Sequence, residues 1–258
     1  MRESASGKVF IVGAGPGDPE LITIKAMRRI EQADVILYDR LINKELLGYA
    51  SSHAELVYCG KAPGSHAMSQ QLINEALVHY ARQGKTVVRL KGGDPLVFGR
   101  GAEEALALAA QGISYEIVPG ITSAIGAAAA AGIPVTHRDY AASFACVTGS
   151  RCHGDKMAIR WDLLAHSVDT LAIYMGVSEL PAIRDELLKH GKASYTPVAL
   201  IERGTTPSQR TIIGTLADIH TLALSMKLSN PALIIIGEVV SVREQLLQAE
   251  QHAAALIG

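Results

Sequence analysis

The sequence predicts an α/β protein with two α/β domains, built on a parallel five-stranded sheet in the N-terminal domain and on a mixed sheet in the C-terminal domain. In residues 1–119, five short apolar runs alternate with helix-like segments, which is the pattern of a parallel sheet with helices on both faces. In residues 120–258, two adjacent strands joined by a loop around Gly204 indicate an antiparallel pair, so this sheet is mixed. We place the domain boundary between residues 119 and 120 and expect a cleft between the domains.

The composition fits a protein with a sizeable core and argues against several functional classes. The chain has 258 residues, 48% of them hydrophobic, and a net charge of −1, which argues against the strongly basic surface typical of nucleic-acid-binding proteins. No apolar run is long enough to span a bilayer, so neither a nucleic acid nor a membrane is an expected partner. The three cysteines form no C-x-x-C pair and predict a reducing cytoplasm, with no disulfide framework and no structural metal.

The first strand and the helix that follows it open the N-terminal domain. Residues 9–12 are a continuous apolar run, as expected for a strand covered on both faces. Beyond the glycine-rich turn at 13–19, apolar residues recur at a spacing close to the helical period. This spacing predicts a helix with the following residues inward: Leu21, Ile24, Ala26, Met27 and Ile30.

Two further strands are predicted at 35–38 and 56–58, with a short helix near 44–48 between them. Asp39 follows the first of these strands directly. Ser69 is a residue type that caps helix N-termini, and it begins a predicted helix that reaches Gln83. The residues expected to face inward from this helix are Leu72, Ile73, Ala76, Leu77 and Tyr80.

The stretch 86–104 has the order strand, glycine turn and helix. β-favouring residues run to Leu90, the chain breaks at Gly92-Gly93-Asp94-Pro95, and an Ala/Leu/Glu-rich helix begins after Gly101. This order puts bare backbone at the carboxyl edge of the sheet, where open α/β sheets bind small molecules. Arg100 and Glu103 lie three residues apart on one helix face, either as a solvated ion pair or as part of a site.

A fifth strand at 114–118 completes the predicted parallel sheet. Polar or glycine-rich turns follow four of the five strands, after Val12, Tyr38, Leu90 and Val118. The carboxyl ends of parallel strands lie at one edge of a sheet, so these turns can converge on one site.

The C-terminal domain begins with a helix of small residues at 123–131. Strands are expected at 144–148, 170–175, 197–201, 211–214 and 233–237, and helices near 180–190, 216–226 and 242–255. We assign Cys146 to the core of this domain, and Met175, at the end of a strand, is normally a core residue as well.

The spacing Gly13-x-Gly15-x-Gly17, with Asp39 at the end of the second strand, is partly similar to a dinucleotide-binding turn. That fingerprint requires G-x-G-x-x-G with a helix starting inside it, so that the helix N-terminus faces a pyrophosphate. Here Pro16 and Pro19 fall within the turn and Gly17 comes one residue early. A plain structural turn is therefore favoured over a nicotinamide cofactor site.

Charged residues gather near the predicted turns, at Asp39, Lys61, Arg100, Glu103 and Arg138. Most residues in such places are simply solvated. The functional alternative is that opposite charges in a cleft bind an anion and hold a proton acceptor. The other polar candidates are expected to be surface or loop residues, with no second ligand pair for a metal: Cys152, His153, His66 and His137.

Taken together, the motifs are more specific than any one of them. They are, in chain order, V-G-A-G-P-G-D-P-E-L-I-T at 12–23, L-Y-D-R-L at 37–41, G-K at 60–61, L-K-G-G-D-P-L-V-F-G-R-G at 90–101, V-P-G-I-T-S-A at 118–124, I-P-V-T-H-R-D at 133–139, Y-M-G at 174–176 and N-P-A-L-I-I-I-G-E-V-V at 230–240. This series resembles the tetrapyrrole methylase family over nearly the whole chain. T-H-R-D and G-G-D-P-L-V-F-G-R-G favour members that act on uroporphyrinogen III, in the stand-alone form without a dehydrogenase/chelatase module.

The resemblance implies a homodimer that binds S-adenosyl-L-methionine, as methyl donor, between its two domains. Asp39 and Lys61 match positions of a proton acceptor and a proton donor in relatives, and Arg100 and Glu103 match positions that handle the tetrapyrrole. The donor contacts implied by the same motifs are Pro16, Gly92, Gly93, Asp94, Val97, Thr122, Ser123, Met175 and Gly204.

The implied reaction is the transfer of two methyl groups to uroporphyrinogen III, which gives precorrin-2 by way of precorrin-1. The donor is already an activated electrophile, so the protein mainly has to align the reacting atoms and exclude water. The methylated adduct is cationic and must lose a proton, for which a carboxylate is a suitable acceptor. We favour Asp39 in that role and Arg100 as the group that orients a substrate carboxylate, because a guanidinium stays protonated.

Three alternatives stay open from the sequence. One is another precorrin methyltransferase of the cobalamin pathway, with the same fold and a different target carbon. The others are an NAD-dependent dehydrogenase and a metabolite sensor without turnover. The product of the favoured reaction serves sirohaem, cobalamin or haem d1 biosynthesis, and the sequence does not distinguish these pathways.

Overall fold

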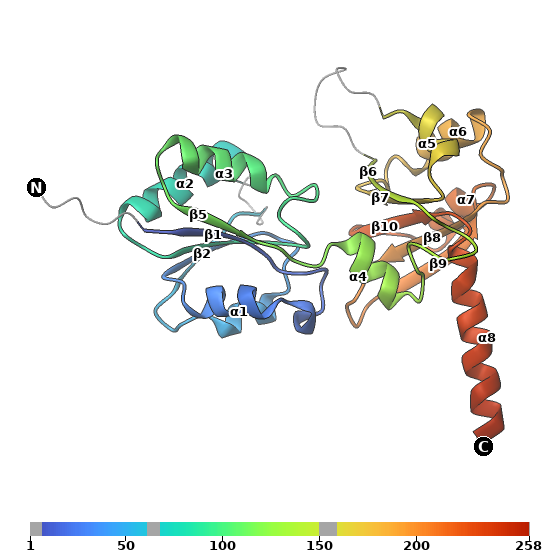
Figure 1. Ribbon diagram of the computed structural model, residues 1–258, viewed down its shortest axis with the longest axis horizontal. Helices are drawn as coiled ribbons and strands as arrows, with labels where there is room; N and C mark the ends of the chain where they lie inside the picture. The colour runs from blue at the N-terminus through green and yellow to red at the C-terminus, as the bar shows by residue number, and fades with distance from the viewer. Residues whose placement is uncertain (1–6, 61–67, 150–158, 258) are drawn as a thin grey trace, which may run out of the picture. The chain divides into compact units, whose positions relative to one another are not determined.

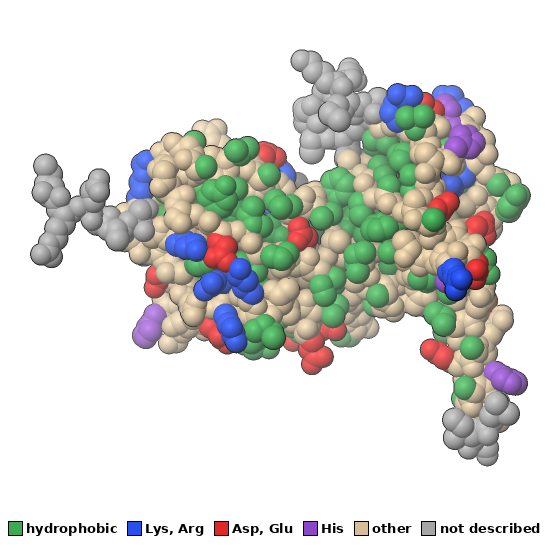
Figure 2. All heavy atoms as spheres, viewed as in Figure 1, with side chains coloured by type: hydrophobic (Ala, Val, Ile, Leu, Met, Phe, Trp, Pro, Cys, Tyr) green, Lys and Arg blue, Asp and Glu red, His purple; other side chains and the backbone are tan. Residues whose placement is uncertain are grey.

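The chain folds into two compact units, Met1–Thr122 and Ser123–Gly258, each with its own sheet (Figure 1). The structure is a computed structural model that describes residues 7–60, 68–149 and 159–257. On the face shown in Figure 2, both units carry acidic as well as basic side chains. None of the helices in the described ranges combines the length and apolar character needed to cross a membrane.

The N-terminal unit is built on a five-stranded sheet in the order β3-β2-β4-β1-β5, with every neighbouring pair parallel. This confirms the predicted parallel sheet. The inner strands β4 and β1 are covered on both faces of the sheet, and every residue in them is buried. The strands are β1 Val9–Gly13, β2 Val35–Tyr38, β3 Glu55–Tyr58, β4 Val87–Lys91 and β5 Tyr115–Val118.

Helices cover both faces of this sheet (Figure 1). On one face lie α1 Ile24–Glu31 and the 3-10 helices Pro19–Leu21 and Lys44–Tyr49, and on the other lie α2 Gln70–Arg82 and α3 Gly101–Ala110. Two apolar clusters result, one on each face of the sheet.

The inward faces of α1 and α2 are narrower than the sequence predicted. Thr23 caps α1 by accepting a hydrogen bond from the Ala26 amide at 3.1 Å, so the helix begins only at Ile24. The buried residues of α1 are Ala26 and Ile30, four apart on one face, and Ile24 falls outside that face and is exposed. In α2, Ser69 is the predicted N-cap and accepts from the Leu72 amide at 3.2 Å, but the Leu72 side chain is exposed. Assigning Ile24 and Leu72 to the core was wrong.

The C-terminal unit has a five-stranded sheet in the order β6-β7-β10-β8-β9. β6 and β7 are parallel and the other neighbouring pairs are antiparallel, which confirms the predicted mixed sheet. The strands are β6 Phe144–Thr148, β7 Thr170–Tyr174, β8 Pro197–Glu202, β9 Arg210–Thr215 and β10 Ala232–Ile236. Cys146 is exposed, so its assignment to the core was wrong, because β6 is an edge strand of this sheet.

Helices of the C-terminal unit fall close to the predicted positions, with one addition. The helix that the sequence did not predict is α5 Trp161–Ser167, a seven-residue segment without a side-chain cap. Figure 1 shows α8 projecting beyond the sheet of this unit. The other helices are α4 Ser123–Ala130, α6 Leu180–Lys189, α7 Ile219–Ser225 and α8 Val240–Ile257.

Candidate active site

Three glycine turns meet at the carboxyl edge of the N-terminal sheet. The Gly15 amide donates to the Gly93 carbonyl at 3.2 Å, and the Gly93 amide donates back to the Gly15 carbonyl at 2.7 Å. A Cβ built on Gly13 would lie 2.6 Å from the Gly120 nitrogen, a distance that real side chains do not reach. The turns after β1, β4 and β5 are therefore packed backbone against backbone, as the parallel order predicts.

Gly92 and Gly93 are restricted to glycine for different reasons. A Cβ on Gly92 would lie 3.1 Å from the Leu41 Cβ, so protein packing limits that position. Gly93 has a φ of +67°, in the left-handed region that favours glycine, and its Cβ would meet nothing closer than the Thr122 Cα at 3.9 Å. Space at the surface of this turn is therefore open at Gly93 and restricted at Gly92.

Asp94 joins two of these turns. Its Oδ1 accepts from the Leu96 amide at 2.8 Å, and its Oδ2 accepts from the Gly120 amide at 3.1 Å. Asp94 was predicted to contact the methyl donor, but both of its carboxylate oxygens accept hydrogen bonds from the N-terminal unit itself. The carboxylate thereby fixes the turn after β4 against the turn after β5.

Arg100 and Glu103 form the ion pair that their spacing allowed. The Arg100 Nε and one terminal nitrogen donate to the two Glu103 oxygens at 2.9 and 2.8 Å, and both side chains are about half exposed. The hydrogen bond from Arg100 lowers the pKa of Glu103. Phe98 and Arg100 have φ values of 53° and 59°, and such left-handed backbone in non-glycine residues costs about 1–3 kcal/mol each and is frequent at functional sites.

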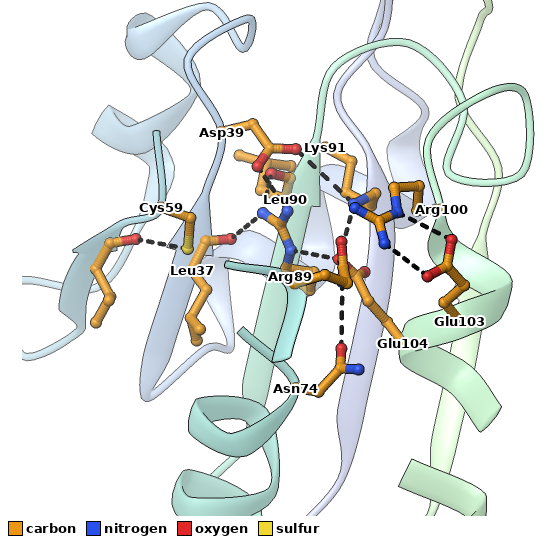
Figure 3. A network of polar contacts seen from close by, with 12 residues as sticks. Leu37, Asp39, Cys59, Asn74, Arg89, Leu90, Lys91, Arg100, Glu103 and Glu104 are labelled. Carbon is orange, nitrogen blue, oxygen red and sulfur yellow. Dashed lines mark hydrogen bonds and ion pairs between the residues drawn. The ribbon is translucent and has the colours of Figure 1, made fainter. Parts of the chain in front are cut away.

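Asp39 is bound to a buried ionic network that the sequence reasoning did not identify (Figure 3). A terminal nitrogen of Arg89 lies 2.6 Å from Asp39 Oδ1, and Lys91 Nζ lies 3.9 Å from Oδ2. On the other side, Arg89 Nε and Lys91 Nζ both reach Glu104 Oε1, at 3.0 and 2.9 Å. Gln70 donates to the same oxygen at 3.1 Å. We call Asp39, Arg89, Lys91 and Glu104 the Glu104 network.

Burial distinguishes the members of this network. The side chains of Arg89, Lys91 and Glu104 are 2%, 3% and 0% exposed, whereas that of Asp39 is 31% exposed. Removal from water, followed by the charge of Arg89, lowers the pKa of Lys91, although Glu104 opposes the shift. Burial likewise raises the pKa of the nearby Cys59 thiol. The network therefore runs from a fully buried carboxylate to one that solvent reaches.

A sequence signal for this network did exist. Arg89 and Lys91 are two positions apart in a strand that is otherwise apolar, so they point to the same face of the central strand β4. A charged side chain in a strand that is buried along its whole length must itself be buried, so Arg89 pointed to an ion pair inside the protein. The partner, Glu104, was hidden because the first turn of α3 also contains the exposed Glu103.

The remaining candidates of the N-terminal unit lie in or beside the same turns. Pro16, Val97 and Thr122 are partly buried there. Lys61 lies outside the described residues, as do His66, Cys152 and His153.

In the C-terminal unit, Met175 directly follows β7 and Gly204 lies two residues beyond β8. Met175 has a φ of +53° and is 50% exposed, so its interpretation as a core residue was wrong. Arg203 and Thr205, on either side of Gly204, also have left-handed φ values, of 48° and 68°. A Cβ on Gly204 would collide with the Ala127 Cβ, which explains a glycine at that position.

Two further candidates, Ser123 and His137, lie near the start of the C-terminal unit. Ser123 begins α4. His137 accepts from the Asp139 amide at 3.2 Å through Nδ1, which confirms it as a loop hydrogen-bonder, and Arg138 beside it is exposed.

The glycine turn after β1 is not arranged as a dinucleotide site. α1 begins at Ile24, well beyond Gly17, and its N-terminus is capped by Thr23. The Gly15 backbone is paired with Gly93 instead of facing a helix N-terminus. Within the described ranges, no group of three or more His, Cys, Asp or Glu side chains is placed to hold a metal ion.

The profile of the Tetrapyrrole (Corrin/Porphyrin) Methylases family matches residues 8–220. The chain belongs to the tetrapyrrole methylase family. It is 62% identical over 235 residues to the uroporphyrinogen-III C-methyltransferase of Priestia megaterium, a match that covers 91% of this chain and 99% of that protein. The family resemblance found in the sequence motifs is thereby confirmed.

Solved structures of tetrapyrrole methylases share the fold. The uroporphyrin-III C-methyl transferase from Thermus thermophilus, complexed with S-adenyl homocysteine, has a TM-score of 0.79 and 41% identity, and the match covers 92% of this chain and 94% of that one. A cobalt precorrin-4 methyltransferase has a TM-score of 0.80 and 29% identity, with 90% of this chain and 95% of that one covered.

The chemistry available at this sheet edge suits a tetrapyrrole methylase. The glycine turns present backbone with little side-chain bulk. Arg100 adds a half-exposed guanidinium, which is paired with Glu103, and Asp39 adds a carboxylate in contact with solvent. Aligning an activated methyl group and accepting a proton require no nucleophilic triad.

Proposed function

We propose that this chain transfers methyl groups from S-adenosyl-L-methionine to uroporphyrinogen III, giving precorrin-2 by way of precorrin-1. The observation that carries the proposal is the identity of 62% with a uroporphyrinogen-III C-methyltransferase over 99% of that relative's length. The solved relative with bound S-adenyl homocysteine, the demethylated form of such a donor, supports the choice of donor.

We further propose that both units contribute to donor binding. In the N-terminal unit the glycine turns bring backbone amides and carbonyls to one edge, and in the C-terminal unit the left-handed Met175 ends β7 with an exposed side chain. Positioning of the donor's sulfur and methyl against a ring carbon is the main demand on such a site. The proposed donor contacts are Pro16, Gly92, Gly93, Asp94, Val97, Thr122, Ser123, Met175 and Gly204.

For the proton that the methylated adduct loses, we propose Asp39 as acceptor; Lys61 matches the position of a proton donor in relatives. A solvent-accessible carboxylate takes up the proton and balances the transient positive charge of the adduct. Arg100 and Glu103 then serve the tetrapyrrole, with Arg100 gripping a substrate carboxylate through two parallel hydrogen bonds. An anionic substrate and a near-neutral protein with a local cation are electrostatically compatible.

The test is mass analysis of the product formed from uroporphyrinogen III and the methyl donor by the purified chain. Two added methyl groups support the proposal, and no added methyl group contradicts it. The second candidate, a later precorrin methyltransferase, is favoured by the similarity to the cobalt precorrin-4 methyltransferase. Under this second candidate, the chain would bind the methyl donor but would not methylate uroporphyrinogen III. Its substrate would instead be a precorrin that already carries more methyl groups.

We also propose that the chain works as a homodimer in the cytoplasm, where its product enters sirohaem or cobalamin biosynthesis. An apolar groove in the C-terminal unit, between α4 and the start of α8, is the surface we assign to a second copy. Its apolar lining residues include Ile125, Ala129, Pro134, Val135, Val242 and Leu246. Light scattering on the purified chain tests this, with the Leu246→Asp variant expected to be monomeric.

A further inference from the structure

We propose that Glu104 positions the Asp39 carboxylate for proton removal, acting through Arg89 and Lys91. The inference rests on the proposed methyl transfer and adds three positioning residues to that reaction. None of the three needs to touch the substrate.

Within the Glu104 network, Arg89 connects Glu104 to Asp39. Its Nε binds Glu104, and a terminal nitrogen of the same planar guanidinium binds Asp39 (Figure 3). The other terminal nitrogen donates to the Leu37 and Leu90 carbonyls at 3.5 and 3.4 Å. A planar fork with bonds on every side has little rotational freedom. The Arg89 guanidinium therefore holds Asp39 Oδ1 in a fixed position.

Glu104 supplies the buried negative charge that pairs with the two buried cations, Arg89 and Lys91. Oε1 of Glu104 accepts from Arg89, Lys91 and Gln70, while Oε2 has no hydrogen-bond partner among the described residues. Removing a charge from water costs several kcal/mol unless it is paired. Without the charge of Glu104, Asp39 would be the single carboxylate of the network left to pair with Arg89 and Lys91. The two cations would then have to change the positions in which they bind Asp39.

Stability of the fold is a poor explanation for this arrangement. Arg89 and Lys91 lie on the face of β4 covered by α2 and α3, where the neighbouring positions Val87 and Leu108 are apolar. Well-packed apolar residues at such positions are often as stabilising as a buried ionic network, or more so. The network also ends at a solvent-accessible carboxylate, at the edge where the glycine turns meet. Both observations point to a role in what Asp39 does.

A positioning residue loses its effect when its target is removed, and a double-mutant cycle measures this. We would compare Glu104→Gln, Asp39→Asn and the double variant, recording kcat, KM for uroporphyrinogen III and affinity for the methyl donor. Glu104→Gln keeps the shape of the side chain and removes its charge. We expect kcat to fall about tenfold to a hundredfold, within the range of coupling between residues of one ion-pair network, with affinity for the methyl donor unchanged. In the Asp39→Asn background the same change should cost less than about twofold.

The matched control is Glu186→Gln, which breaks an exposed pair with Lys189 in α6 and should leave kcat unchanged. If Glu104→Gln does not fold, Arg89→Lys replaces it in the cycle, because an ammonium keeps the charge but cannot bridge both carboxylates.

Equal losses of kcat from Glu104→Gln in the wild-type and Asp39→Asn backgrounds would overturn the inference. Normal turnover of Asp39→Asn would also overturn it, while leaving methyl transfer intact. A wild-type chain that does not methylate uroporphyrinogen III would instead refute the proposed function, and the inference with it.

Discussion

A terminal nitrogen of Arg89 binds Asp39 Oδ1 at 2.6 Å, although the two residues are fifty positions apart in sequence and Arg89 is 2% exposed. The bond couples the end of β2 to the adjacent strand β4. The Asp39 carboxylate is therefore paired with two cations of the Glu104 network, Arg89 and Lys91.

Asp39→Asn should therefore reduce turnover without preventing ligand binding. The amide keeps the shape of the side chain but is a poor base, and loss of a general base lowers kcat by roughly two to four powers of ten. Single-turnover kinetics with the donor in excess measure the effect, and calorimetry checks that donor affinity survives. Near-normal turnover in a folded variant would transfer the role to Glu103, to Arg100 or to solvent.

Gly93→Ala should weaken donor binding by more than its effect on stability explains. Alanine at a φ of +67° costs about 1–2 kcal/mol of folding free energy, and the added methyl projects into the open space of the turn. Gly112→Ala is a matched control, because Gly112 has the same φ of +67° and open space around it at the end of α3. Denaturant unfolding should give similar losses for both variants, and only Gly93→Ala should lose donor affinity. Similar donor affinity for the two would remove Gly93 from the site.

Arg100→Lys should raise KM for the tetrapyrrole while donor affinity stays the same. Lysine keeps the charge but loses the fork that binds a carboxylate with two parallel bonds. Arg160→Lys is the control, since Arg160 makes a comparable exposed pair with Asp162 in the C-terminal unit. Steady-state kinetics with each ligand varied separate the two effects. Equal loss of both ligands in Arg100→Lys would mean that Arg100 supports the donor pocket or the fold.

Acid stability should depend on Glu116 in the edge strand β5. Hydrogen bonds from Lys25 and Lys8 lower the pKa of Glu116 from 4.5 to about 2. Because the folded-state pKa is the lower one, these pairs stabilise the fold above about pH 4.5, and the contribution is lost as the pH falls towards 2. The free energy of unfolding should fall less steeply in this window for Glu116→Gln and for Lys25→Met. Since the pairs lie at the surface, salt should weaken the effect. An unchanged slope in both variants would contradict this account.

The local pattern of the sequence determined most elements, because their periodicity depends only on neighbouring residues. Continuous apolar runs marked β1 and β2, Ser69 marked the start of α2, and the Gly92-Gly93 turn marked the end of β4. Parallel order then implied that the turns after β1, β4 and β5 share an edge, since strands in βα units all point the same way.

Burial and pairing over long sequence distances were decided only by the tertiary structure. Whether Leu72 or Ile73 faces the core depends on how α2 is rotated against the sheet, and Cys146 is exposed because β6 lies at an edge. The Glu104 network is the clearest case. The spacing of Arg89 and Lys91 in β4 indicates buried charges, but it does not identify the residues that pair with them. Residues from β2, β4 and α3 come within hydrogen-bonding distance only when the sheet and its helices assemble.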